Sequence, residues 1–261
     1  MTQPTSTGPL AGRHALVTGA SRGIGAAIAR ALASDGAAVT LLGRRPEALQ
    51  DLAAELGPAH GWVTADVADE TAVQAAVKQA RAARGAIAIL VNNAGQAESA
   101  PFARTSSALW HRMLAINLTG TFHCTQAVLP DMLAARAGRI VNVASTAAQR
   151  GYAYVSAYAA AKHGVLGLTR SLALELATQG VTVNAVCPGY TETDIVQSAI
   201  DNIVAKTGRS PDEARAELAK GNPQGRLIQP DEVADAVRWL CSAGAQAITG
   251  QAVSVSGGEV M

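Results

Sequence analysis

Short runs of β-forming residues alternate with longer helical patterns along the chain, and this alternation limits the folds open to it. The run HALVT at 14–18 leads through a glycine-rich turn into a helical pattern at 23–34, and the same order recurs several times. A strand, a crossover helix and a second parallel strand form a right-handed unit, so helices cover both faces of the sheet. The pattern predicts an α/β fold built on a doubly wound parallel sheet.

Turn and capping residues set the predicted boundaries of these elements. Gly36 can end the first helix, Pro46 can open the second, and Gly57 can close it. The predicted strands are 14–18, 38–42, 61–65, 87–91, 139–144, 181–187 and, at the sheet edge, 252–256. The predicted helices are 23–34, 46–57, one from about Asp69, 107–136 and 156–178.

The length of 261 residues suffices for one large α/β domain, and 49% of the residues are hydrophobic. We predict a flexible tail at 1–12 and a single domain at 13–261. Residues 190–228 are polar, contain several Gly and Pro residues and carry one or two short helical patterns. This segment is predicted to be a small helical lid over a substrate.

Composition and charge exclude several functions. The net charge is +1 and no long Lys/Arg run occurs, which argues against nucleic-acid and membrane-surface partners. The first residues lack the pattern of a secretory signal, and polar residues interrupt the longest uncharged run, so no membrane span is predicted. The three cysteines and five histidines form no metal-binding pattern. We expect a cytoplasmic protein with reduced thiols and small-molecule partners.

The stretch TGASRGIG at 18–25 lies between the first predicted strand and the first predicted helix. Gly19, Gly23 and Gly25 permit a tight turn and close approach of the backbone to a pyrophosphate at the helix N-terminus. The spacing is G-x-x-x-G-x-G rather than the commoner G-x-G-x-x-G. The stretch therefore predicts a Rossmann-like dinucleotide site, with a purely structural turn as the alternative.

The end of the second predicted strand carries GRR at 43–45, where many dinucleotide sites place an acidic residue that binds the adenosine ribose. The forked guanidinium of Arg44 suits a 2′-phosphate, and Arg22 can supply a second cation. The sequence predicts NADP(H) in preference to NAD(H), although NAD remains possible. Alternatively, Arg44 and Arg45 are solvated loop residues.

The helical stretch AYAAAKHG at 157–164 places Tyr158 and Lys162 four residues apart, so both side chains share one helix face. Taken alone, the pair can be a surface contact in which the lysine stem lies over apolar surface. A chemical role needs support from the rest of the chain.

That support comes from an ordered set of motifs: TGASRGIG, NNAG at 92–95, Asn117, Ser145, YAAAK at 158–162 and PG at 188–189. In this order and spacing they resemble the short-chain dehydrogenase/reductase family over roughly residues 11–258. The resemblance implies that Tyr158 is the general acid in carbonyl reduction and the base in alcohol oxidation.

The resemblance also implies roles for the residues around Tyr158. Lys162 would bind the nicotinamide ribose and, with the oxidised ring, lower the pKa of the phenol. Burial opposes that shift, but a unit charge about 5 Å away contributes on the order of 3 kcal/mol. Ser145 would bond the substrate oxygen, and Asn117 would hold a water in a proton relay. Alternatively, Ser145 caps its own backbone and Asn117 is structural.

The same resemblance implies a set of cofactor contacts. Asp66 would contact the adenine and Val67 would cover its ring, while Thr191 would bond the carboxamide and Asn92 would support the sheet edge. The full predicted set is Gly19, Ser21, Arg22, Gly23, Ile24, Gly25, Arg44, Asp66, Val67, Asn93, Tyr158, Lys162, Pro188, Gly189 and Thr191.

Stretches such as NLTGTF and VNVASTAAQRG are most similar to bacterial acyl-thioester and polyketide ketoreductases, which favours reduction of a 3-oxoacyl thioester or related ketone. Arg150, Lys206, Arg209 and Arg226 can meet a phosphopantetheine or CoA phosphate, or can be solvated charges. One alternative is an alcohol or sugar dehydrogenase working oxidatively. Another is a non-catalytic protein that senses the cofactor.

Two further expectations concern surfaces. Tyr152 and Tyr154, in the loop before the Tyr158 helix, can line the substrate site or simply pack. The helices at 107–136 and 156–178 carry more small and apolar positions than one face of sheet contact requires. Because relatives commonly pair through these helices, we predict a homotetramer.

Overall fold

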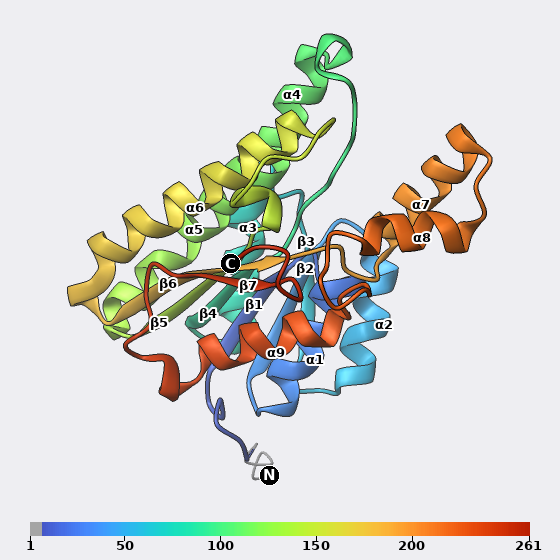
Figure 1. Cartoon of the computed structure of the whole chain (residues 1–261). Coiled ribbons are helices and arrows are strands. Elements are labelled where there is room, and N and C mark those ends of the chain that lie inside the picture. Colours follow the sequence, from blue (N-terminus) through green and yellow to red (C-terminus); the bar gives the residue numbers. More distant parts are fainter. Residues whose placement is uncertain (1–6) are drawn as a thin grey trace.

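Seven parallel strands form one sheet in the order β3-β2-β1-β4-β5-β6-β7 in the computed structural model, which describes residues 7–261 (Figure 1). The strands are β1 (His14–Thr18), β2 (Ala38–Gly43), β3 (Gly61–Thr64), β4 (Ile87–Asn92), β5 (Gly138–Val143), β6 (Val181–Pro188) and β7 (Ala252–Val255). The strand order reverses between β1 and β4, and ligands of such sheets bind where the carboxyl ends of the strands meet that reversal. The predicted fold class is confirmed.

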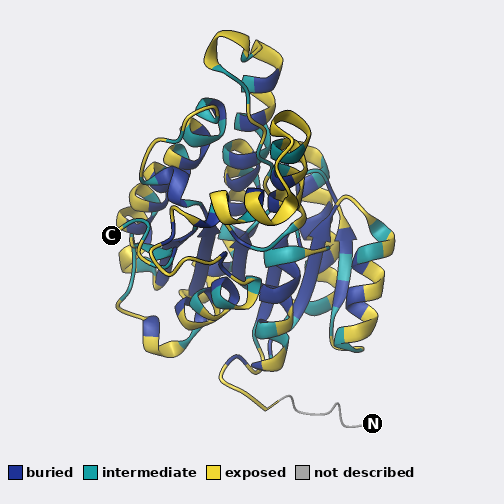
Figure 2. Cartoon of the chain, turned by 45° about the vertical axis from the view of Figure 1, so that its right-hand side comes forward, coloured by how far each residue is buried: buried dark blue, intermediate teal, exposed yellow. Residues whose placement is uncertain are grey.

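Helices cover both faces of this sheet. They are α1 (Gly23–Ser34), α2 (Pro46–Leu56), α3 (Glu70–Arg84), α4 (Ser107–Leu114), α5 (Gly120–Ala135), α6 (Ser156–Leu176), α7 (Asp194–Thr207), α8 (Pro211–Ala219) and α9 (Pro230–Cys241). One apolar cluster packs α1, α2 and α9 on one face, and a second packs α3, α5 and α6 on the other. Figure 2 accordingly shows buried strands enclosed by helices whose outer faces are exposed.

The long helix predicted at 107–136 is interrupted. A π-helical turn, η2 (Ala115–Thr119), joins α4 to α5, and the buried Asn117 lies within it. A π-turn lengthens the hydrogen-bonded ring by one residue and often marks a functional site. Sequence periodicity does not reveal this turn, because the residues on either side keep their helical pattern.

Helix α9 was not among the predicted elements, although residues around its start carry helix signals. Pro230 opens the helix, and Gln229 and Glu232 form a capping box. The helix packs Val233 and Val237 into the same core as α1.

The predicted tail at 1–12 is only partly described, because residues 1–6 lie outside the described residues. Residues 7–12 do not form a loose tail. The side chain of Leu10 is fully buried, and its backbone N–H donates to the carbonyl of Asp35 at 2.9 Å. A buried leucine stabilises the fold by about 2 kcal/mol, which explains why this segment is held.

The polar segment 190–228 contains α7 and α8, which project beside the sheet as a helical hairpin (Figure 1). The hairpin has a small apolar cluster of its own, formed by Val196, Ile200, Ala214, Ala219 and Leu227. Within residues 7–261, no helix has the length and apolar character needed to cross a membrane.

His14 is a buried histidine whose two ring nitrogens are both hydrogen-bonded. Nδ1 lies 2.8 Å from the carbonyl of Gly85, and Nε2 lies 2.8 Å from Oγ1 of Thr40. Because a carbonyl only accepts, Nδ1 carries the proton and Nε2 accepts from the threonine hydroxyl. Burial lowers the pKa of His14 below its ordinary value of 6.5.

We expect His14→Gln to flatten the pH dependence of the free energy of unfolding between about pH 7 and pH 5. The pKa of His14 in the folded protein lies below its pKa in the unfolded chain. The stability that neutral His14 contributes is therefore fully present above the unfolded pKa and is lost as the pH falls through the folded pKa. One such group changes the slope by up to about 1.4 kcal/mol per pH unit. Urea unfolding measures the slope. The exposed-site control His111→Gln should keep the wild-type slope, and an unchanged slope in His14→Gln would contradict the assignment.

Candidate active site

Tyr158, Lys162, Ser145 and Asn117 come from three elements that meet at one edge of the sheet. Tyr158 and Lys162 lie on α6, Ser145 follows β5, and Asn117 lies in η2. Ser145 lies near enough to the Tyr158 hydroxyl to act on its pKa, and Nζ of Lys162 lies 5.7 Å from the centre of the Tyr158 ring. A Cβ placed on Gly95 would lie 2.9 Å from Oδ1 of Asn117 and 3.6 Å from Nζ of Lys162. The four predicted residues are therefore brought together.

The packing around Tyr158 shifts the pKa of its phenol. Burial raises this pKa above its ordinary value, and the proximity of Ser145 only partly opposes the shift. Lys162 does not counteract it in this structure. Its ammonium donates to the carbonyl of Val143 at 2.8 Å, and burial lowers the pKa of Lys162 itself to about 8. Desolvation therefore outweighs the nearby cation in setting the direction of this shift. The expected lowering of the Tyr158 pKa by Lys162 together with the oxidised nicotinamide ring stays a prediction.

Ser145 caps a short helix and also lies beside Tyr158. Its Oγ accepts from the backbone N–H of Ala147 at 3.1 Å, at the start of the short helix η3 (Thr146–Ala148). It also lies near enough to Tyr158 to lower the pKa of the phenol. A hydroxyl has one proton and two lone pairs, so the backbone cap and the contact with Tyr158 are compatible.

The side chain of Asn117 holds the loop after β4. Its Nδ2 donates to the carbonyls of Gln96 at 2.9 Å and Met113 at 3.0 Å, and its Oδ1 accepts from the N–H of Gln96 at 3.1 Å. This is the structural role that the sequence left open. The predicted water relay to Lys162 stays a prediction.

The glycine turn has a conformation that side chains would prevent. Gly19 has a φ of +63°, and a Cβ there would lie 2.8 Å from Cα of Ala94. A Cβ on Gly25 would lie 2.3 Å from the carbonyl oxygen of Gly19. Nδ2 of Asn93 donates to the carbonyls of Thr18 and Gly19 at 3.0 and 3.2 Å, which fixes the turn against β4.

The adjoining end of α1 suits an anion. No side chain caps this helix end, and its first turn contains no acidic residue. Backbone N–H groups at such an end attract phosphate. The glycine turn and the helix end together fit a dinucleotide pyrophosphate.

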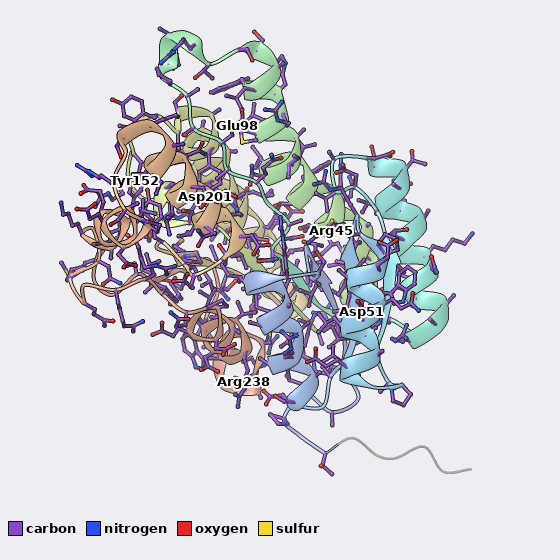
Figure 3. The ribbon with its side chains drawn as sticks, turned by 90° about the vertical axis from the view of Figure 1, so that its right-hand side faces the viewer. Arg45, Asp51, Glu98, Tyr152, Asp201 and Arg238 are labelled. Carbon is purple, nitrogen blue, oxygen red and sulfur yellow. The ribbon has the colours of Figure 1, made fainter. Side chains whose placement is uncertain are left out.

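The predicted arginines lie around this turn but are engaged by protein groups. Arg22 forms an ion pair with Asp194, which joins the glycine turn to the start of α7. Nη1 of Arg44 lies 3.6 Å from Oδ2 of Asp66, and Nη2 of Arg45 lies 3.4 Å from Oγ of Ser21. Figure 3 shows Arg45 just above α2, the helix that carries Asp51. Both Arg44 and Asp66 are substantially exposed, so solvent screens their attraction.

The other predicted cofactor residues occupy the loops at this edge. Val67 is buried against Gly120 of α5. Gly189 follows β6 and donates its N–H to the carbonyl of Val255 at 3.0 Å, and Oγ1 of Thr191 donates to the carbonyl of Gly189. Gly23 and Ile24 begin α1, the latter packed against the core.

The proposed phosphate-binding cations do not gather in one place. Arg226 is paired with Glu232, at 2.6 and 2.7 Å, and Arg209 lies 3.5 Å from Glu217. Arg150 instead stacks over the Tyr152 ring, 4.7 Å from its centre.

Three residues join the site that the sequence did not indicate. Tyr190 lies near enough to Tyr158 to raise its pKa, Asp194 pairs with Arg22, and Glu259 bonds Tyr152. Only Tyr190 had a local signal, since it follows the predicted Pro188–Gly189 pair.

Comparison with known proteins identifies the family to which the chain belongs. A model of the family described as short chain dehydrogenase matches residues 13–203. The chain belongs to the short-chain dehydrogenase family. The resemblance drawn from the ordered motifs is thereby confirmed, and the protein is an oxidoreductase that acts on CH–OH groups with NAD(P).

Individual relatives match nearly the full length. The cis-4-hydroxycyclohexanecarboxylate dehydrogenase of Sinomonas cyclohexanicum is 43% identical over 250 residues, covering 94% of this chain and 96% of that protein. The 3-oxoacyl-(acyl-carrier-protein) reductase FabG of Vibrio harveyi is 40% identical over 252 residues, covering 97% and 99%. A crystal structure of an actinorhodin polyketide ketoreductase variant with NADPH superimposes with a TM-score of 0.91 at 40% identity, covering 95% of this chain and 97% of that one.

Proposed function

We propose that this short-chain dehydrogenase reduces a 3-oxoacyl thioester or related ketone with NADPH. The observation that carries the proposal is the meeting of Ser145, Tyr158 and Lys162 at one edge of the sheet, with Nζ of Lys162 5.7 Å from the centre of the Tyr158 ring. A protonated phenol is the form that reduction of a carbonyl needs, since it must donate a proton. Relatives named as 3-oxoacyl and polyketide ketoreductases support the substrate class.

The roles of the catalytic residues follow from their chemistry. The substrate carbonyl oxygen accepts hydrogen bonds from the Ser145 and Tyr158 hydroxyls, which stabilise the charge that develops on it. When bound, the reduced nicotinamide supplies hydride to the carbonyl carbon. Tyr158 donates its proton to the oxygen, and the positive charge of Lys162 stabilises the phenolate that remains. Asn117 is proposed to hold the water that returns a proton toward Lys162.

The cofactor is proposed to lie along the glycine turn and the loops after the strands. Arg44 and Arg22 are proposed to bind the 2′-phosphate, which requires Arg44 to give up an exposed ion pair worth about 0.2–1 kcal/mol. The remaining proposed contacts are Gly19, Ser21, Gly23, Ile24, Gly25, Asp66, Val67, Asn93, Pro188, Gly189 and Thr191. Residues 190–228 are proposed to be the lid that covers the substrate.

Tyr158→Phe is expected to lower the rate of acetoacetyl-CoA reduction with NADPH by about 10²- to 10⁴-fold, because the proton donor is lost. The exposed-site control Tyr154→Phe should keep the wild-type rate. The measurement is the initial rate on a panel of substrates. Thioesters and small ketones are assayed with NADPH, and secondary alcohols and sugars are assayed with NADP⁺. Wild-type turnover in Tyr158→Phe would refute the mechanism.

The same substrate panel separates the alternatives. Activity confined to alcohols or sugars would favour an oxidative dehydrogenase, as the name of the Sinomonas relative suggests for that protein. Tight NADPH binding without turnover on any substrate would favour the cofactor-sensing protein.

Arg44→Ser should lower the ratio of kcat/KM for NADPH to that for NADH by at least about tenfold, because a charged hydrogen bond to the 2′-phosphate is removed. Arg104→Ala is the control, because it also removes one positive charge but at an exposed arginine outside the proposed cofactor site. It should leave the NADPH-to-NADH ratio of kcat/KM unchanged. A wild-type enzyme that prefers NADH would overturn the proposed NADP(H) preference.

A homotetramer is proposed from apolar side chains exposed on α5 and α6. Phe122, Leu133 and Leu174 are 44%, 37% and 84% exposed. Light scattering at micromolar concentration should give four times the chain mass of 26.6 kDa. Leu174→Asp should lower that mass, whereas Phe102→Asp, outside these helices, should not. A monomeric wild-type protein would refute the assembly.

A cytoplasmic setting is also proposed. Cys124, Cys187 and Cys241 are all free and buried, and burial raises the pKa of each thiol. Inert, unpaired thiols are common in a reducing compartment.

A further inference from the structure

The carboxylate of Glu259, in the segment after β7, is enclosed by three other parts of the chain. Its Oε1 accepts a hydrogen bond from the Tyr152 hydroxyl at 2.6 Å. A Cβ on Gly189 would lie 3.0 Å from Oε2, and one on Gly221 would lie 2.9 Å from Oε1. The Glu259 side chain therefore lies between the loop after β6 and the end of the proposed lid, in space that a side chain at either glycine position would share.

A turn at Gly257 and Gly258 positions Glu259 between these segments. Gly257 and Gly258 have φ values of +62° and +95°, which glycine adopts readily. A Cβ on Gly257 would lie 1.9 Å from Oδ1 of Asn222. The N–H of Glu259 donates to the carbonyl of Ser256 at 3.2 Å, which closes the turn.

Tyr152 links Glu259 to the turn that carries Ser145. The Tyr152 oxygen lies 2.8 Å from Oγ1 of Thr146, the buried neighbour of Ser145. A phenol has one proton, and Tyr152 donates it to the carboxylate, so the threonine hydroxyl donates to the phenol oxygen. Burial and the carboxylate both raise the pKa of Tyr152, so this donor stays protonated.

The aromatic ring of Tyr152 lies between Tyr190 and Arg150. It meets the Tyr190 ring edge-on, with centroids 6.4 Å apart, and Tyr190 in turn lies near Tyr158. The Arg150 guanidinium covers the same ring, and its Nη1 lies 3.5 Å from the backbone carbonyl of Glu259. Tyr152 and Asp201 of the lid lie on one side of the molecule in Figure 3.

We propose that Glu259 is a positioning residue that holds Tyr152 as a wall of the substrate site and fastens the lid end to the Ser145 turn. This inference rests on the proposed ketone reduction. Glu259 and Tyr152 touch neither the reacting atoms nor the proposed cofactor contacts except through Gly189. They therefore act on how the substrate fits rather than on the proton transfer.

Steady-state kinetics with NADPH and the best ketone of the panel test this role. Glu259→Ala and Tyr152→Phe should each raise KM for the ketone about 5- to 10-fold, with kcat and the Kd of NADPH changed by less than about twofold. The double variant should match the single ones, because both remove the same hydrogen bond. Glu259→Gln keeps an acceptor for the Tyr152 hydroxyl and should restore most of the wild-type KM.

Ser254→Ala is the matched control. Its Oγ lies 3.0 Å from Oε1 of Gln149, so it ties β7 to the same loop without touching Tyr152. A control that raises KM as much as Glu259→Ala, additive effects in the double variant, or an unchanged KM in Glu259→Ala would each overturn the proposal. A parallel fall in kcat, NADPH affinity and Tm would also overturn it, because that result indicates general destabilisation.

Hydrogen exchange measured by mass spectrometry tests the contact without any substrate. Glu259→Ala should speed exchange in peptides covering 145–152 and 219–223, and Ser254→Ala should not speed it in the second peptide. An enzyme that reduces no ketone would refute the proposed function, while this exchange result would still decide whether Glu259 holds the two segments. Unchanged exchange in both peptides would refute the positioning role.

Discussion

A buried series of hydrogen bonds between side chains joins the elements that carry the active site. Nδ2 of Asn92 donates to Oγ1 of Thr125 on α5 at 3.1 Å and to Oδ1 of Asn142 at 2.9 Å, and Nδ2 of Asn142 donates to Oγ1 of Thr169 on α6 at 2.8 Å. Asn92 and Asn142 are also register partners on β4 and β5. Because these groups are buried, breaking one bond would leave a polar atom unsatisfied at about 1–3 kcal/mol. The helix with Tyr158 and the strand before Ser145 are thus held in a single relative position.

Burial is the second constraint, and it acts on both titratable residues of the site. It raises the pKa of Tyr158 and lowers the pKa of Lys162 to about 8. Both shifts favour neutral forms, because a low-dielectric surrounding disfavours charge. With a pKa of about 8, Lys162 remains largely protonated at neutral pH and keeps a positive charge near the Tyr158 ring.

The helical hairpin of α7 and α8 contacts the rest of the chain near both of its ends. Asp194, at the start of α7, pairs with Arg22 of the glycine turn, and a Cβ placed on Gly221, just after α8, would lie 2.9 Å from Oε1 of Glu259. The hairpin is therefore packed against the glycine turn at one end and against the segment after β7 at the other.

The sequence by itself determined all seven strands, most of the helices and the chemistry carried by local patterns, but not α9 or the π-turn η2. The strand at 14–18 and the helix at 23–34 match β1 and α1 residue for residue. A strand-turn-helix unit depends on residues that are adjacent in the sequence. The spacing of Tyr158 and Lys162 fixed their common helix face in the same way. Only the tertiary structure decided the contacts of Asp194 and Glu259, whose partners lie 172 and 107 residues away and leave no local pattern. It also decided the direction of the Tyr158 pKa shift, because desolvation depends on every element packed around the phenol and not on the lysine four residues along the helix.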